Sequence, residues 1–277
     1  MSTTFHEIHN AQAPRLKTPH FLVDHEFKHV EKPFPSVASY MVFCGKSRSG
    51  KSSLITSILT NRRVYRNAFH NVIIVIPKHS FQSITPADNP FLHLDKEKIY
   101  HDFSYDILEQ IFNQVMGYAQ EEEDTLMLID DYASELENGD VLKLLNSLVN
   151  NRRHLRLSIW MGVQTYKSIP LSNRKTINVL VLFKCMNKAE IKCIWEEMSF
   201  LSKEAFFDLL VYVFQRPFDY LVLDRDNNEY YRKWNKIEIY NKEDHYAKKN
   251  SSNKRNIVVN PFKKNKSLRC HNHNHRP

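Results

Sequence analysis

Five segments of strand length along the chain are rich in hydrophobic residues, and the one at 71–77 is a continuous apolar run. The five segments lie at residues 39–44, 71–77, 125–131, 155–164 and 178–184. Continuous apolar runs, in place of strict alternation, are typical of strands that are covered on both faces, as in a parallel sheet. The pattern therefore predicts five buried strands.

Between and after these segments, apolar residues recur at helical spacing. This spacing predicts helices at about 53–60, 104–119, 141–149, 188–198 and 203–215. Residues 219–235 predict a final pair of strands joined by a turn at Asn227 and Asn228. Strands that alternate with helices predict an α/β fold, with a mostly parallel central sheet, helices on both faces and a C-terminal hairpin.

Both ends of the chain differ from this alternating body. Residues 1–38 contain several prolines and no long periodic pattern, which predicts an extended N-terminal lead-in. Residues 242–277 hold ten of the 39 basic residues and two of the 31 acidic ones, so the rest of the chain is neutral. We therefore expect one folded domain at residues 39–241 and a basic, disordered tail. That tail could contact nucleic-acid phosphates, or it could be a solvated end without a role.

The composition excludes several classes of protein. With 42% apolar and 25% charged residues, the body is neither disordered nor fibrous. No apolar run approaches about 18 residues, and the N-terminus lacks the pattern of a secretory signal, so we expect an intracellular protein without a membrane span. The four cysteines form no CxxC pair, which disfavours a structural zinc site or disulfide framework. His271, His273 and His275 could bind a metal ion, although such terminal clusters more often bind nothing specific.

A phosphate-binding motif follows the first predicted strand. Residues 45–52 read GKSRSGKS and fit the pattern G-x4-G-K-[ST]. Backbone N–H groups of such a loop surround a phosphate, Gly50 allows a close approach, Lys51 neutralises the β- and γ-phosphates, and Ser52 coordinates Mg²⁺. The motif predicts an ATP site formed by Gly45, Lys46, Ser47, Arg48, Ser49, Gly50, Lys51, Ser52 and Ser53.

Two carboxylates end the third predicted strand. In an ATPase with this loop, Asp130 would hold the magnesium ion and Asp131 would orient or deprotonate the attacking water. Many hydrolysing relatives have the longer Glu at the second position, so Asp131 favours a less direct contact with the water. A purely structural pair at the end of a strand is the alternative.

Polar residues also flank the fourth predicted strand. Gln164 ends it and could bind the γ-phosphate or the water. Arg153, which precedes the strand, could reach the nucleotide of a neighbouring subunit and stabilise transition-state charge. The alternative is that Arg152, Arg153 and Arg156 are solvated cations at a helix end, favoured there by the helix dipole.

Several motifs occur in a characteristic order: GKSRSGKS, LMLIDD, NRRHLRLSIWMGVQT, IPLSNRK and LFKCMNKAEI. Over about residues 33–235 this order resembles the FtsK/HerA group of DNA-pumping ATPases. It is most similar to the poxvirus-like packaging ATPases of large nucleocytoplasmic DNA viruses, a type that virophages share.

The resemblance implies a RecA-like P-loop core that hydrolyses ATP with Mg²⁺. It further implies a ring of five or six subunits that moves double-stranded DNA into a preformed capsid, with a capsid or portal component as partner. The protein would act at viral assembly sites in the host cytoplasm or accompany the virion.

The family's functional residues match positions of this chain. Lys51 and Ser52 match the phosphate-loop pair, and Asp130 and Asp131 match the magnesium-binding and water-activating acids. Gln164 matches the sensor of hydrolysis. The arginine that acts on a neighbouring subunit matches Arg153, with Arg152 as its alternative. An Arg–Lys pair matches Arg174 and Lys175, and its role, nucleotide sensing or DNA contact, stays open.

Two other functions remain as alternatives. A nucleoside or nucleotide kinase uses the same loop, but it does not need the segment that leads to Gln164. A virion DNA-binding protein could keep ATP as a structural ligand and bind DNA through the basic tail.

Overall fold

The structure is a computed structural model that describes residues 30–82, 89–185 and 187–239. Its strands are β1 (Tyr40–Cys44), β2 (Asn71–Val75), β3 (Ile99–Tyr100), β4 (Thr125–Asp130), β5 (Leu157–Val163), β6 (Val179–Phe183), β7 (Tyr220–Asp224), β8 (Glu229–Arg232) and β9 (Asn235–Ile237). Its α-helices are α1 (Lys51–Thr60), α2 (Lys78–Gln82), α3 (Tyr105–Gln120), α4 (Gly139–Asn151), α5 (Leu171–Arg174), α6 (Lys188–Met198) and α7 (Lys203–Val213). Short 3₁₀ turns are η3 (Pro90–His93), η4 (Lys96–Lys98), η5 (Ala133–Glu137) and η6 (Tyr166–Ser168).

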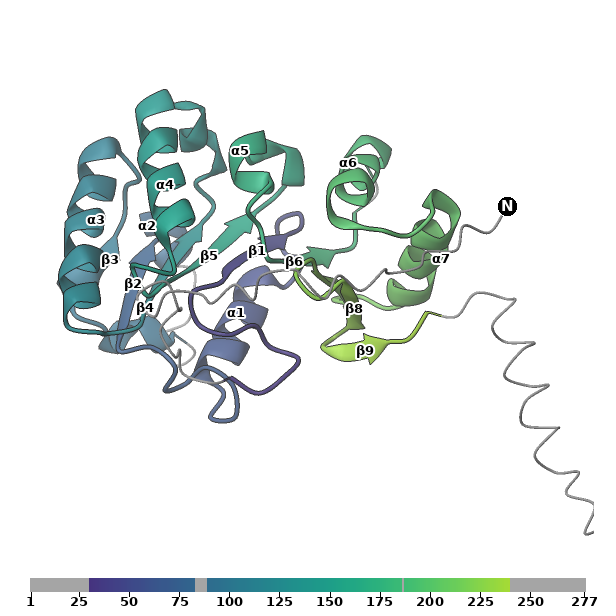
Figure 1. Cartoon of the computed structure of the whole chain (residues 1–277), viewed down its shortest axis with the longest axis horizontal. Coiled ribbons are helices and arrows are strands. Elements are labelled where there is room, and N and C mark those ends of the chain that lie inside the picture. Colours follow the sequence, from purple (N-terminus) through teal and green to yellow (C-terminus); the bar gives the residue numbers. More distant parts are fainter. Residues whose placement is uncertain (1–29, 83–88, 186, 240–277) are drawn as a thin grey trace, which may run out of the picture. The chain divides into compact units, whose positions relative to one another are not determined.

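All the strands belong to one sheet in the order β3-β2-β4-β5-β1-β6-β7-β8-β9 (Figure 1). The strands from β3 to β6 run parallel, and β6 to β9 pair antiparallel. The predicted mostly parallel α/β fold is therefore confirmed.

The antiparallel end of the sheet is larger than the sequence predicts. The expected hairpin exists as β7 and β8, but β9 adds a third strand and β7 pairs with β6. At the other edge, the two-residue β3 was not predicted, because two residues are too few for a periodic pattern to be visible.

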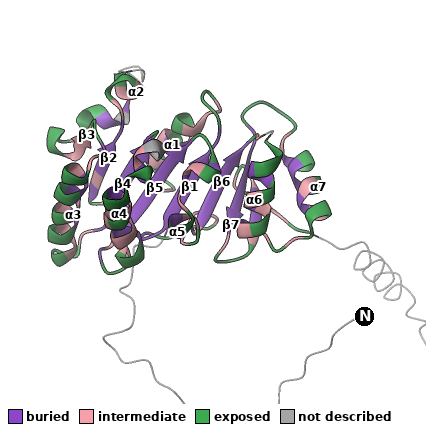
Figure 2. Cartoon of the chain, turned by 90° about the horizontal axis from the view of Figure 1, so that it is seen from above, coloured by how far each residue is buried: buried purple, intermediate pink, exposed green. Residues whose placement is uncertain are grey.

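The sheet separates two hydrophobic cores. Buried residues of α3, α4, α6 and α7 pack on one face, and α1 packs on the other together with residues of the segments 30–37 and 65–69. Figure 1 shows α3, α4, α5 and α6 along one side of the sheet and α1 on the opposite side. In Figure 2 the strands are buried, whereas the helices expose their outer faces. Coverage of both faces explains why the five predicted strands are rich in apolar residues.

The structure describes only part of the segments that flank the predicted domain. Val30 and Val37 are buried in the core on the α1 face, so the last part of the expected lead-in packs with the sheet. The predicted tail at residues 242–277, including its histidines, lies outside the described residues. The boundaries at 39 and 241 therefore stay predictions.

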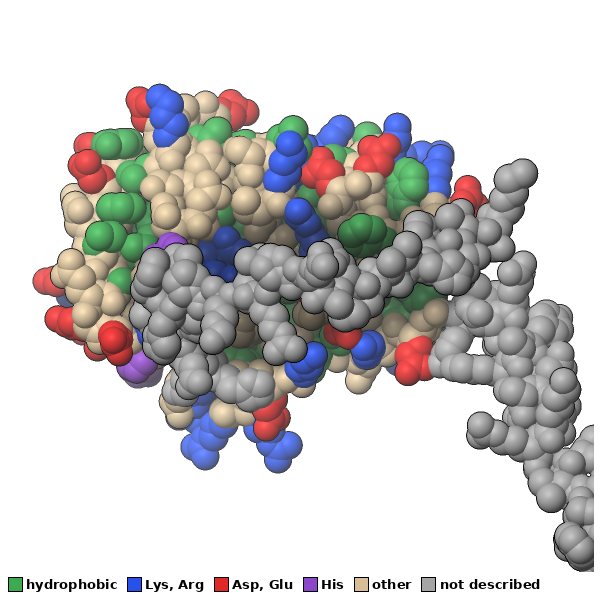
Figure 3. All heavy atoms as spheres, viewed as in Figure 1, with side chains coloured by type: hydrophobic (Ala, Val, Ile, Leu, Met, Phe, Trp, Pro, Cys, Tyr) green, Lys and Arg blue, Asp and Glu red, His purple; other side chains and the backbone are tan. Residues whose placement is uncertain are grey.

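The surface of the body carries charge of both signs. Figure 3 shows acidic and basic side chains interspersed on the face that carries α3 to α6. Among the described residues, no helix combines the length and the apolar character that crossing a bilayer requires.

Candidate functional site

The strand ends that carry the predicted site residues meet at one edge of the sheet. Cys44 of β1 pairs in register with Val163 of β5, and Asp130 of β4 pairs with Gly162 of β5. Because these strands are parallel, the residues that follow each of them emerge at the same carboxyl edge. Gln164 therefore ends the strand next to the phosphate-loop strand, as predicted.

The phosphate loop depends on its two glycines. The amide of Gly45 donates a hydrogen bond to the Val163 carbonyl at 3.0 Å, which joins the loop to β5. A Cβ atom on Gly45 would lie 2.7 Å from the Phe183 Cβ. Gly50 has a φ of +98° immediately before α1, a conformation that L side chains rarely adopt. The loop can therefore turn tightly into α1.

The start of α1 is suited to an anion. No side chain caps its N-terminus, and its first turn contains no acidic residue. The first N–H groups of a helix have no intrahelical partner, and the helix dipole is positive at this end. Nearby, the Ser49 hydroxyl is buried without a hydrogen-bond partner among the described residues. These donors fit a phosphate group.

Lys51 lies over the loop. Its Nζ donates hydrogen bonds to the carbonyls of Gly45 at 2.6 Å and Lys46 at 3.3 Å. An ammonium group has three donors, so these two bonds leave one for a phosphate oxygen.

Ser52 and Asp130 are in contact, as expected for a shared metal ion. The Ser52 hydroxyl donates a hydrogen bond to Asp130 Oδ2 at 3.2 Å. A hydroxyl and a carboxylate are oxygen ligands of the kind that Mg²⁺ prefers, and Mg²⁺ usually binds through one or two carboxylates plus substrate phosphates. The donor set therefore fits magnesium.

Asp130 has an unusual environment for a carboxylate. Burial raises its pKa, and the neighbouring Asp131 raises it further, whereas Lys51 and the hydrogen bond from Ser52 lower it. The net effect is a raised pKa, so the ionised form of Asp130 is destabilised unless a positive charge lies nearby. A bound cation would supply that charge and stabilise the ionised carboxylate.

Gly162 makes room for Asp130, and the sequence did not single it out. A Cβ atom at Gly162 would lie only 2.1 Å from Asp130 Oδ1. Any side chain at this position would therefore displace the carboxylate. The available signal was compositional, since the chain has only five glycines and this one falls in a buried strand.

Asp131 and Gln164 contact each other directly. Gln164 Nε2 donates a hydrogen bond to Asp131 Oδ1 at 3.0 Å, and both residues are exposed. Asp131 has a φ of +64°, and its amide donates to the Gly162 carbonyl at 3.1 Å. Because the backbone of Asp131 is left-handed, the chain turns directly after β4. The Asp131 carboxylate then lies within hydrogen-bond distance of the Gln164 side-chain amide.

These groups line one cavity of about 380 Å³. Its walls contain the loop residues 47–53 together with Asp130, Asp131 and Gln164. Ile76, which follows β2, and Ser80 of α2 also line it, and the sequence did not identify them. The structure thus brings together the predicted phosphate, metal and water-binding groups.

The predicted arginines before β5 lie at the opposite edge of the sheet. The Arg152 carbonyl accepts from the amide of Leu157, the first residue of β5. A strand rises about 3.3 Å per residue, so the length of β5 puts these arginines about 20 Å from the cavity of their own chain. Arg152 donates to the Val149 carbonyl and to Asn178, whereas Arg153 is exposed. The geometry favours Arg153 over Arg152 as the residue that could reach another subunit.

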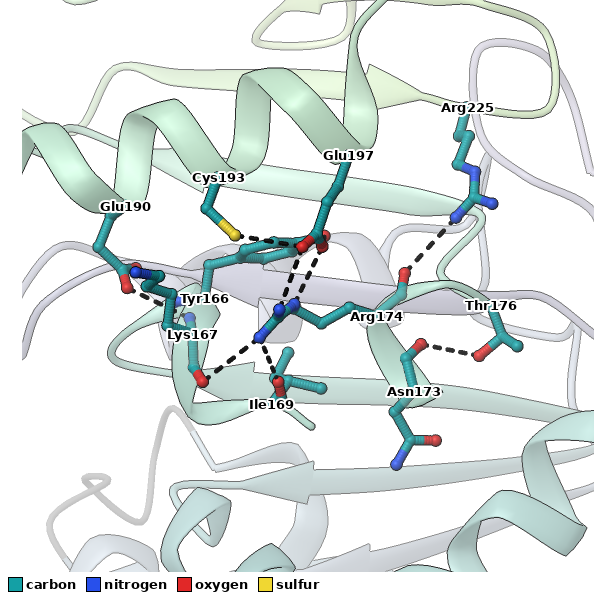
Figure 4. Close-up of polar contacts among 10 residues, drawn as sticks. All are labelled: Tyr166, Lys167, Ile169, Asn173, Arg174, Thr176, Glu190, Cys193, Glu197 and Arg225. Carbon is teal, nitrogen blue, oxygen red and sulfur yellow. Dashed lines mark hydrogen bonds and ion pairs between the residues drawn. The ribbon is translucent and has the colours of Figure 1, made fainter. Parts of the chain in front are cut away.

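Arg174 has a role that neither sequence-based interpretation included. It makes two hydrogen bonds to Glu197 of α6, at 2.9 and 3.1 Å, and donates to the Ile169 carbonyl at 2.8 Å (Figure 4). Tyr166 donates to the same carboxylate through its hydroxyl at 3.0 Å. Arg174 therefore fixes the segment after Gln164 to α6. Lys175 is exposed.

Glu190 is a second anchor of this segment. Its buried carboxylate accepts hydrogen bonds from the amides of Tyr166 at 2.7 Å and Lys167 at 3.2 Å (Figure 4). These amides lie two and three residues after Gln164. Glu190 thus holds the backbone that carries Gln164, a contact that the sequence could not indicate because the two positions are far apart in the chain.

The sequence of the chain matches the model of a known protein family. A family model described as "Poxvirus A32 protein" matches residues 27–266. Among curated proteins, none is significantly similar in sequence.

Solved structures share the fold at low sequence identity. B204, the DNA-packaging ATPase from Sulfolobus turreted icosahedral virus, is 15% identical with a TM-score of 0.56, over 74% of this chain and 99% of its own. The B204 genome-packaging NTPase of Sulfolobus turreted icosahedral virus 2, in complex with ATP-γS, is 15% identical with a TM-score of 0.53, over 73% and 98%. EssC (ATPases 2 and 3) from Geobacillus thermodenitrificans is 10% identical with a TM-score of 0.51, over 79% and 43%.

Proposed function

The chain belongs to the poxvirus A32 protein family, and from this premise we propose that it is an ATP-hydrolysing motor that packages double-stranded viral DNA into a capsid. One observation carries the proposal. Ser52 with Asp130, and Asp131 with Gln164, meet the phosphate loop around a single cavity. The fold is shared with B204, which is named a DNA-packaging ATPase and whose relative was solved with an ATP analogue.

The triphosphate would lie in the phosphate loop. The uncapped amides at the start of α1 and the Lys51 ammonium would bind its β- and γ-phosphate oxygens. Ser52 and Asp130 would hold Mg²⁺, which neutralises charge on the phosphates when bound.

Hydrolysis needs a water molecule in line with the γ-phosphate. Asp131 would accept a proton from this water as its oxygen bonds to the γ-phosphorus, and the bond from the γ-phosphorus to the β,γ-bridging oxygen breaks to give ADP and phosphate. Gln164, which contacts Asp131, would orient the water and respond to the loss of the γ-phosphate. Because Glu190 and Arg174 tie the following segment to α6, that response would reach α6.

The proposal includes assembly into a ring of five or six subunits. Arg153 is exposed at the edge opposite the cavity, and in a ring it would approach the γ-phosphate of a neighbouring subunit. The partners would be double-stranded DNA and a capsid or portal component, at assembly sites in the host cytoplasm. The basic tail at residues 242–277 is an additional candidate for contact with DNA.

The function is tested by the rate of phosphate release across protein concentrations, with and without long double-stranded DNA. A packaging motor predicts a rate per subunit that rises with both. A rate that is independent of both would contradict a DNA-driven ring. Transfer of phosphate to a nucleoside in place of release to water would indicate a kinase.

A further inference from the structure

Phe218 lies at the same sheet edge as the phosphate loop. Tyr220 pairs antiparallel with Phe183, so β7 begins where β6 ends, next to the end of β1. A Cβ atom on Gly50 would lie 3.3 Å from Phe218 Cδ1. The ring of Phe218 therefore borders the turn that enters α1.

Phe218 has two features that packing does not explain. Its side chain is 66% exposed, although it is a large apolar ring. Its φ is +63°, in the left-handed region that a bulky residue rarely adopts. A strained backbone conformation persists only where contacts with the surrounding structure hold it in place. Such conformations concentrate at functional sites.

The contacts of the neighbouring Asp219 hold the backbone of Phe218 in this conformation. It is buried, and its Oδ2 accepts hydrogen bonds from the amides of Gln215 at 3.2 Å and Arg216 at 2.8 Å. The same carboxylate pairs with Arg232 at 3.0 Å and Lys233 at 2.7 Å. Burial raises the pKa of Asp219, but these hydrogen bonds and ion pairs outweigh it and keep the pKa well below its usual range. The turn before β7 is thus fixed, and Phe218 is held in its exposed position.

The order of the strands gives the direction of a bound nucleotide. The groups for the γ-phosphate, Asp131 and Gln164, follow β4 and β5 on one side of β1. The nucleoside end of the molecule must extend away from them. Phe218 lies on the other side of β1, with β6 and β7, and Gly50 lies between.

We propose that Phe218 is the platform on which the base of the nucleotide stacks. This inference rests on the proposed ATP site and adds a residue that binds the nucleoside part of the substrate. A flat, exposed ring on a fixed turn binds a base with little loss of conformational freedom. Stacking on a phenyl ring recognises any aromatic base, so the residue would select nucleoside triphosphates over inorganic polyphosphate without choosing among purines.

The test compares the affinities for ATP and for inorganic tripolyphosphate, each with Mg²⁺, by competition against a fluorescent nucleotide analogue. Phe218→Ala should weaken ATP binding by about 5- to 100-fold, the effect of one base–aromatic stack, and leave tripolyphosphate binding unchanged. Phe218→Tyr should keep the affinity of the parent chain. Phe200→Ala is the matched control, because Phe200 is another exposed phenylalanine (77%) that follows α6 and, unlike Phe218, is not among the atoms nearest to Gly50.

The possible outcomes separate this inference from the proposed function. ATP affinity that is unchanged in Phe218→Ala, or lowered equally in Phe200→Ala, overturns the role of Phe218. So does a loss of tripolyphosphate binding equal to the loss of ATP binding, since that result would indicate a distorted loop. If the parent chain binds neither ligand, the proposed ATP site itself is wrong.

Discussion

The two edges of the parallel sheet hold their functional side chains in different ways. At the carboxyl edge, polar groups from three strand ends contact one another across a cavity, as Ser52 does with Asp130 and Gln164 with Asp131. At the amino edge, Arg152 is bonded to its own subunit, whereas Arg153 is exposed. The carboxyl edge therefore brings together the candidate phosphate, metal and water-binding groups of one chain, and the amino edge exposes Arg153.

The role that an arginine can have depends on the contacts that its side chain makes. From the sequence, Arg153 is expected to act on a neighbouring subunit, and the role of Arg174 stays open. The structure separates them, because Arg174 is held by Glu197 and by backbone carbonyls (Figure 4). Arg174 therefore stabilises the contact between α6 and the segment after β5, whereas Arg153 is distinguished by its exposure at the amino edge.

The largest expected effect is at the carboxyl edge. Lys51→Ala should reduce phosphate release by about 1000-fold or more, because it removes a charge that stabilises the transition state. Lys143→Ala is the control, since Lys143 is exposed on α4. A Lys51→Ala chain that hydrolyses ATP at the parental rate would place the chemistry elsewhere.

Gly162→Ala should reduce the rate by about 100-fold, since a displacement of about 1 Å at a reacting group can have this effect. Its Cβ would lie 2.1 Å from Asp130 Oδ1 and would move the carboxylate. Overpacking should also lower the free energy of unfolding by about 1–3 kcal/mol. Gly117→Ala is the matched control, because its added Cβ would have no atom within 4 Å apart from the chain neighbours and the backbone of its own helix. Equal phosphate release by the two variants would exclude a special role for Gly162.

At the amino edge, we expect Arg153→Ala to act only between subunits. The DNA-stimulated rate of the assembled protein should fall by about 100-fold, the lower end of the loss when one donor to transition-state charge is removed. Binding of ATP to dilute subunits should be unchanged, and mixing with Lys51→Ala subunits should partly restore the rate because each variant keeps the group that the other lacks. Failure of the mixture to recover would identify Arg153 as a surface cation.

The smallest effect on catalysis is expected from Arg174→Gln. Loss of the ion pair to Glu197 should lower the free energy of unfolding by about 1–3 kcal/mol, measured by urea denaturation at neutral pH. ATP affinity should not change, and Lys175→Gln should alter neither quantity. A large loss of ATP affinity in Arg174→Gln would instead support nucleotide sensing.

The same pair predicts a pH dependence. Burial raises the pKa of Glu197, but hydrogen bonds from Arg174, Cys193 and Tyr166 outweigh it, so the pKa is below the ordinary value of 4.5. A carboxyl whose folded-state pKa is lowered stabilises the fold above its unfolded-state pKa, and this contribution is lost as the pH falls through the folded-state value. The difference in stability between the parent and Glu197→Gln should therefore shrink as the pH falls below 4.5. A difference that stays constant with pH would contradict the role of the ionised carboxylate.

Most of the fold could be predicted because its strands are covered on both faces. Such strands are rich in apolar residues, and the five predicted segments correspond to β1, β2, β4, β5 and β6. The short β3 and β9 lack enough residues to show a pattern.

The candidate site could be predicted only where one local segment or one strand end defines it. The phosphate loop and the strand-end residues Asp130 and Gln164 are of this kind. Gly162, Glu190 and Phe218 are not, because their positions follow from the register between strands and from contacts between distant segments. A single sequence contains no direct record of such contacts.

The most direct test of the account is a calorimetric titration of ATP into the purified chain, with Mg²⁺ present. Binding of one nucleotide per chain that is lost in Lys51→Ala, and weakened when Mg²⁺ is removed, is the predicted result. Absence of binding by the parent chain, or equal binding by Lys51→Ala, would contradict the assignment of the cavity at the carboxyl edge as the ATP site.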